Sequence, residues 1–76
     1  MPLLDYLNIA EKQKGIQHQI AVRNLRAYIN SRVPDHIIAE MRKIENIKVL
    51  KYLQEAGLRG KLYHAFLDHM LRLGRE

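Results

Sequence analysis

The side chains best suited to chemistry in this sequence are its four histidines, His18, His36, His64 and His69. His64 and Asp68 are four residues apart, so on a helix they would share a face, as two metal ligands must. His69 would point about 140° away from His64, and nothing brings His18 or His36 to the same place. We therefore expect no metal and no cofactor. The alternative for His64 is a partly exposed imidazole hydrogen-bonded to a carboxylate.

Groups for nucleophilic or phosphate chemistry are scarce. Ser31 is the only serine, the chain has no cysteine, threonine or tryptophan, and its four glycines are scattered, so no loop resembles a phosphate-binding loop. The carboxylate pairs Glu40/Glu45 and Asp5/Glu11 fall on amphipathic segments and look like surface groups rather than a buried acid–base pair. We expect no catalytic residues and no enzyme.

Charge is the next feature with functional meaning. The net charge is +5, and residues 42–61 concentrate the basic side chains Arg42, Lys43, Lys48, Lys51, Arg59 and Lys61. Such a stretch favours anionic partners, either nucleic acid or an acidic protein surface. A helix-turn-helix should have a glycine in its short turn and a polar recognition helix. Here the turn at residues 44–46 has no glycine, and the second helix uses Ile47, Val49, Leu50 and Leu53 for packing. Binding of DNA or RNA is thus the alternative function, and a solvated basic face is the simpler interpretation.

Apolar periodicity and helix-breaking residues predict the elements that must position these groups: four or five short helices and no strand. One helix begins at Pro2 and is ended or kinked by Gly15, and a second runs from Ile16 to about residue 31. Pro34 begins a third, which reaches Ile44, and Asn46 can cap a fourth that ends at Ala56.

Gly57 has the neighbours expected after a helix end. With Gly57 in the left-handed C′ position, Leu58 and Leu53 become the apolar pair of a Schellman motif. Gly60 has no comparable pairing, so we expect a smaller constraint on its backbone.

The last predicted helix, residues 61–73, ends at Gly74 and has more apolar surface than a small domain can cover. One stripe contains Leu62, Phe66, Met70 and Leu73, and a second contains Tyr63, Leu67 and Leu71. A chain of 76 residues forms one domain with a small core and, without cysteine, has no disulfide to stabilise it. We therefore predict that these seven residues form a protein interface and that self-association completes the fold.

The chain also has no apolar run of the roughly 20 residues that a membrane span needs, and its first residues do not resemble a secretory signal. A cytoplasmic location with no membrane partner is the expectation.

Two segments within residues 25–67, LRAYINSRVPDHIIAEMRKI and IENIKVLKYLQEAGLRGKLYHAFL, resemble the helical C-terminal part of the Rpn proteins. These are recombination-promoting, transposase-like nucleases of the PD-(D/E)XK superfamily. The resemblance consists of helical patterns: a proline-started helix, an isoleucine-rich helix, an L-x-x-L helix ending in alanine, and a helix reaching phenylalanine. The acidic and lysine residues of the nuclease site, and the sheet that carries them, have no counterpart here.

The resemblance implies a regulatory role rather than catalysis. Some Rpn family members also produce the tail as a separate small protein, which oligomerises and restrains the full-length nuclease. A chain that begins at Met1 and contains only tail-like helices is similar to such a product. The sequence thus predicts an all-α single domain, residues 1–76, that acts as a non-catalytic, homodimeric or larger oligomerisation module and an inhibitor of a related nuclease. The basic stretch is the departure from the family pattern.

Overall fold

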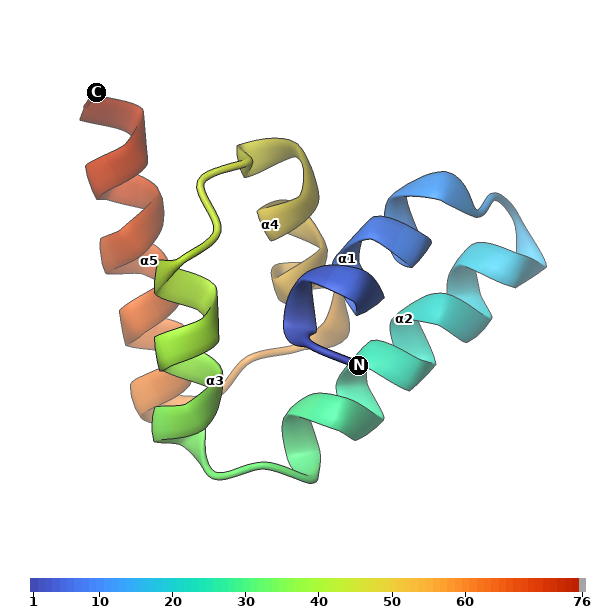
Figure 1. The fold of residues 1–76 in the computed structure, drawn as a ribbon, viewed down its shortest axis with the longest axis horizontal. Helices are drawn as coiled ribbons and strands as arrows, with labels where there is room; N and C mark the ends of the chain where they lie inside the picture. Colours follow the sequence, from blue (N-terminus) through green and yellow to red (C-terminus); the bar gives the residue numbers. More distant parts are fainter. Residues whose placement is uncertain (76) are drawn as a thin grey trace.

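A computed structural model describes residues 1–75, which form five α-helices and, within that range, no strand (Figure 1). The helices are α1 (Leu3–Lys12), α2 (Ile16–Asn30), α3 (Pro34–Arg42), α4 (Ile47–Ala56) and α5 (Gly60–Arg75). The all-α prediction is confirmed, and so is the least obvious boundary, between α3 and α4. None of the helices in residues 1–75 has both the length and the apolar character needed to cross a bilayer.

Local sequence explains where the helices begin. Pro34 occupies the first turn of α3, where its missing N–H costs nothing. Asn46 caps α4, because its side-chain oxygen accepts a hydrogen bond from the Lys48 N–H at 3.0 Å. Gly15 precedes α2 with a φ of 63°, so it turns the chain between α1 and α2.

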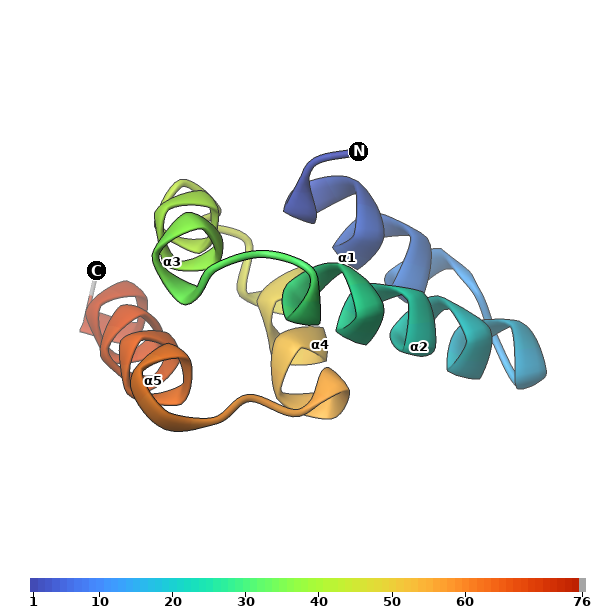
Figure 2. The same cartoon turned by 90° about the horizontal axis from the view of Figure 1, so that it is seen from below.

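The helices form two groups. Helices α1, α2 and α4 pack against one another, and α3 and α5 form a pair that joins this group through α1 and α3 (Figures 1 and 2). The pair runs in parallel. Lys61 Nζ and Asp35 Oδ1, near the two helix starts, are 2.6 Å apart, and His69 Nε2 lies 2.8 Å from the Ile44 carbonyl oxygen beyond the end of α3.

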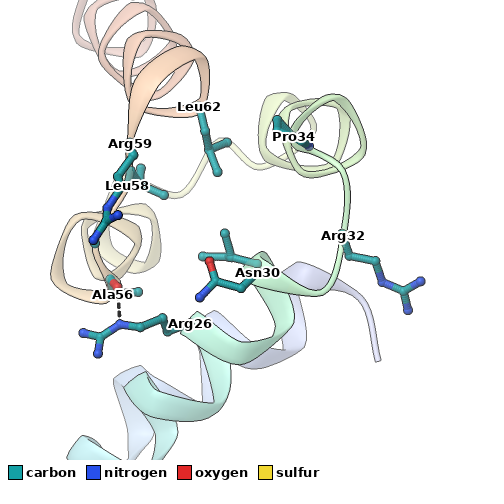
Figure 3. A pocket seen from close by; sticks show the side chains of 10 residues that line it. Arg26, Asn30, Arg32, Pro34, Ala56, Leu58, Arg59 and Leu62 are labelled. Atoms are coloured by element: carbon teal, nitrogen blue, oxygen red, sulfur yellow. Dashed lines mark hydrogen bonds between the residues drawn. The ribbon is translucent and has the colours of Figure 1, made fainter.

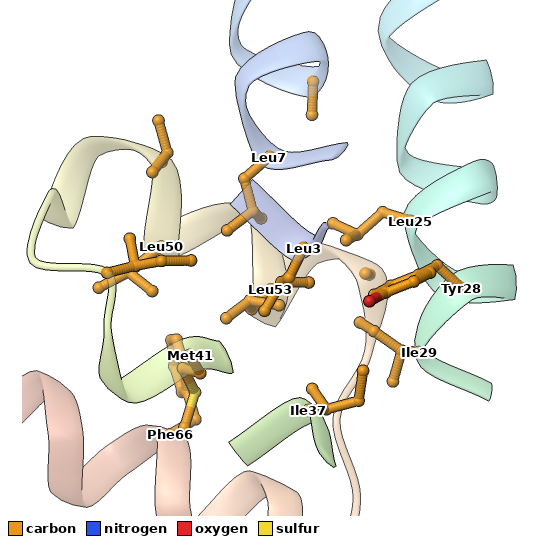
Figure 4. Close-up of a cluster of buried hydrophobic side chains, with 14 of the residues drawn as sticks. Leu3, Leu7, Leu25, Tyr28, Ile29, Ile37, Met41, Leu50, Leu53 and Phe66 are labelled. Carbon is orange, nitrogen blue, oxygen red and sulfur yellow. The ribbon is translucent and has the colours of Figure 1, made fainter. Parts of the chain in front are cut away.

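All five helices contribute to one apolar core between the two groups (Figure 4). Its fully buried side chains come from four helices and include Leu3, Leu7, Leu25, Ile37, Met41, Val49, Leu50 and Leu53. Phe66 of α5 completes the core and is 3% exposed. The chain therefore buries its own core, and any association with a second chain would add to that core rather than close it.

Glu40 of α3 joins three helices. Its carboxylate accepts hydrogen bonds from the Leu3 N–H at 3.2 Å, at the start of α1, and from the Tyr28 hydroxyl of α2 at 2.9 Å. A carboxylate at a helix N-terminus is favourable, because it accepts a hydrogen bond from an N–H that has no partner within the helix. Its negative charge also interacts favourably with the positive end of the helix dipole. Burial, followed by the bond to Glu40, raises the pKa of Tyr28. The prediction that Glu40 is a surface carboxylate is wrong.

The glycines near α5 differ in part from prediction. Gly57 has a φ of 89°, as its helix-ending role requires, and its N–H donates to the Gln54 carbonyl at 3.1 Å. The ψ of Gly57, 110°, directs the chain away from the helix. Among the described residues, the second hydrogen bond of a Schellman motif, from the Leu58 N–H to the Leu53 carbonyl oxygen, therefore does not form.

Two further expectations for this region are wrong. Gly60 also has a positive φ, 55°, so its backbone is as constrained as that of Gly57. Gly74 does not end the last helix, because α5 continues to Arg75. A single glycine weakens a helix without ending it when no left-handed turn follows.

Candidate functional site

Helix α5 has a buried face directed toward α3. Leu62 and Phe66 are part of the core, His69 is 6% exposed, and Met70 and Leu73 pack against the core from its edge. The buried imidazole is satisfied by the Ile44 carbonyl oxygen at 2.8 Å. This face fixes the orientation of α5 relative to the rest of the chain.

A second apolar face of α5 is exposed. Tyr63, Leu67 and Leu71, named here the α5 stripe, are 36%, 39% and 61% exposed. At about 100° per residue, the stripe spans roughly 80° and its centre lies about 120° from that of the buried face. The apolar arc of α5 is therefore about 200° wide, about twice the usual width for a surface helix. No described residue covers its outer part.

The seven predicted interface residues thus divide into three groups. Tyr63, Leu67 and Leu71 are available to a partner. Met70 and Leu73 are half-buried, Met70 at the edge of the stripe and Leu73 on the face directed toward the core. Leu62 and Phe66 lie inside the chain's own core, so their assignment to an interface is wrong. The sequence showed two apolar stripes but not which one α3 would cover.

The six predicted basic contacts are all exposed, but they do not form one surface. Because α3 and α5 are parallel, Arg42 and Lys43 lie at the end of the pair opposite Arg59 and Lys61 (Figure 1). Lys61 is paired with Asp35. Lys48 and Lys51 lie on α4, where the Lys51 ammonium is 5.2 Å from the Tyr52 ring centroid.

A groove of about 660 Å³ lies where the two helix groups meet (Figure 3). Its lining includes Arg26 and Arg32, which sequence reasoning did not single out, together with Arg59 from the loop before α5. Arg26 and Arg59 are 33 positions apart, so only the packing of α2 against α4 brings them to one groove. No sequence signal could have joined them.

Three of the four histidines, His18, His36 and His69, contact other parts of the fold. His18 contacts the Ala10 carbonyl oxygen at 2.7 Å and Glu55 at 2.8 Å, and His36 lies 3.4 Å from Glu40. Asp68 is paired with Arg72, which lowers the pKa of Asp68, so it is not paired with His64. Within residues 1–75, no three His, Cys, Asp or Glu residues gather in a way that could hold a metal.

Comparisons with models of protein families, with curated proteins and with solved structures give no match to this chain. The resemblance to the Rpn tail therefore stays a prediction from its helical patterns.

Proposed function

We propose that this chain is a non-catalytic helical interaction module that associates with a second copy of itself through the α5 stripe. The supporting observation is the exposure of Tyr63, Leu67 and Leu71 on a helix whose opposite face is already anchored in the core. Burying a fully exposed leucine side chain contributes about 1.5–3 kcal/mol. Leu67 and Leu71 are already partly covered, so each gains only the remaining part of this when a partner removes it from water.

A second copy suits this surface because a twofold interface uses the same patch on both partners. The α5 stripe lacks charge, which matters for a chain of net charge +5, since two copies can meet there without opposing cations. Gly60 and Gly74 fall on the same side of α5 as the stripe, so a partner helix can approach closely at both ends.

The size of the surface sets the expected affinity. A 16-residue helix is about 24 Å long, so its face offers less than the roughly 800 Å² per partner of a standard interface. The association should be weak, with a dissociation constant of about micromolar or higher.

The resemblance to the Rpn tail adds a candidate partner, a full-length nuclease that carries a similar helical segment. Inhibition would follow if this chain replaced one copy of that segment in the nuclease oligomer. The same stripe would then mediate both assemblies, so one set of variants tests both.

DNA or RNA binding is supported less well. Arg42 and Lys43 lie at one end of the α3/α5 pair and Arg59 and Lys61 at the other, while Lys48 and Lys51 lie on α4. Lys61 is paired with Asp35 at 2.6 Å. Neutralisation of several phosphates by one protein surface requires cations that lie along a single track.

The test is a pair of charge substitutions in the stripe. Leu67→Glu with Leu71→Glu should abolish association, since a dimer would have to bury four carboxylates. Both residues are exposed, so the helicity and melting curve should stay close to those of the unmodified chain. Sedimentation velocity measures association, and circular dichroism measures the fold.

Ile16→Glu is the matched control. Ile16 is 74% exposed and begins α2, at the far side of the molecule from α5 (Figure 1). Association should persist in this variant. Loss of association in Ile16→Glu, or its survival in the double stripe variant, would contradict the proposal.

A further inference from the structure

The groove between the two helix groups differs from the α5 stripe in position and chemistry. Its lining comes from α2 and the loop after it, the start of α3, the segment 56–59 and the first turn of α5. The floor is apolar and includes Ile29, Leu58 and Leu62. At about 660 Å³, the groove lies within the roughly 300–1,000 Å³ of small-molecule sites.

The charged side chains that line the groove are all positive. Three arginines and no carboxylate line the groove. The acidic residues nearest in sequence to its lining have other partners: Asp35 pairs with Lys61, and Glu55 with His18. A cavity with arginines at its rim and no internal counter-charge attracts anions.

Arg26 and Arg59 are the donors best placed for a ligand. Arg26 Nε donates to the Ala56 carbonyl oxygen at 2.7 Å, which fixes the side chain and leaves its two terminal NH₂ groups available. Arg59 makes no side-chain hydrogen bond or ion pair with another described residue. Figure 3 shows both guanidinium groups on the same rim, on either side of Ala56. Arg32 turns away toward Tyr28, 5.4 Å from that ring.

The backbone beside Arg59 adds further donors. The N–H groups of Leu58, Arg59 and Gly60 form no hydrogen bond with other described residues. The start of α5, a helix of 16 residues, carries the positive end of its dipole at the same place. Arginine forks, unpaired N–H groups and a helix start are the groups with which proteins hold phosphate.

We propose that this groove binds a small organic phosphate ester. The phosphate lies between Arg26 and Arg59, and the organic part covers the floor of Ile29, Leu58 and Leu62. A phosphate group can accept a bidentate pair of hydrogen bonds from each guanidinium. The proposal is independent of self-association, because Tyr63, Leu67 and Leu71 do not line the groove.

Titration with phenyl phosphate, followed through backbone amide resonances, tests the site. Saturable shifts at Leu58, Gly60 and Leu62 are expected at about millimolar ligand. Arg59→Gln should weaken binding at least about tenfold, because it removes one of the two guanidinium groups while breaking no contact of the fold. Phenol, which lacks the phosphate, should not bind.

Arg42→Gln is the matched control, since Arg42 is an exposed arginine at the opposite end of α3 and does not line the groove. It should keep the affinity of the unmodified chain for phenyl phosphate. Equal binding by Arg59→Gln and Arg42→Gln, or no saturable shift, would overturn the proposal.

An oligothymidylate titration separates a small phosphate ester from a nucleic-acid backbone. If the groove binds a small phosphate ester, the oligonucleotide should bind no more tightly than phenyl phosphate at 150 mM salt. Tight binding that is lost in Lys48→Glu with Lys51→Glu, and kept in Arg59→Gln, would contradict the assignment.

Discussion

At Gly57 and Gly60 the backbone angle φ, rather than a contact with neighbouring atoms, determines which residue types the position accepts. Both have positive φ, 89° and 55°, and a Cβ added at either position would meet nothing within 4 Å. The cost of a side chain there is therefore conformational strain alone. Gly74 has the same open surroundings but an ordinary helical backbone.

These three glycines form a matched set for substitution by alanine. Gly57→Ala and Gly60→Ala should each reduce the free energy of unfolding by about 1–2 kcal/mol, because alanine is strained at positive φ. Gly74→Ala should leave it unchanged or raise it by up to about 1 kcal/mol, because alanine favours a helix. Urea titrations of the three variants give the comparison. Equal losses at all three positions would contradict the role of the backbone angle.

At the scale of the elements, His18 joins three helices. It lies on α2, and its ring contacts the Ala10 carbonyl oxygen of α1 and the Glu55 carboxylate of α4. Both partners accept hydrogen bonds, so the imidazole satisfies both only when it is protonated on both nitrogens. The bond to Glu55, followed by that to Ala10, raises the pKa of His18 above its ordinary value.

This contact should make stability depend on pH. A histidine whose pKa is raised by folding stabilises the protein fully below its unfolded pKa, and that contribution is lost as pH rises through the folded pKa. The free energy of unfolding should therefore fall as the pH rises above the ordinary histidine pKa of about 6.5. His18→Gln should remove most of this dependence, whereas His64→Gln, on the exposed surface of α5, should keep it. Identical pH profiles for the two variants, measured by urea titration, would exclude the role of His18.

The helices themselves were predictable, and their neighbours were not. Pro34, Asn46 and Gly57 act within one or two residues, so their capping roles follow from sequence alone. The burial of Leu62 and Phe66, rather than Tyr63 and Leu67, depends on where α3 lies against α5. The groove of Arg26 and Arg59, like the Glu40 contacts, joins residues from distant parts of the chain. Periodicity gives the faces of a helix but not its partners.

For the whole molecule, the core is closed by the chain itself while α5 remains apolar on its outer side. These two facts favour a chain that folds as a monomer and associates reversibly. Folding and association should then be separable, since they use opposite faces of α5. An obligate dimer would instead expose core residues when dissociated.

The molar mass of the unmodified chain across a concentration series tests the central claim most directly. Light scattering coupled to size exclusion should give the monomer mass of 9.0 kDa at low concentration. The mass should rise toward twice that value as protein increases from about 1 µM to about 1 mM, as expected for a weak dimer. A constant 9.0 kDa over the whole range would contradict self-association through the α5 stripe.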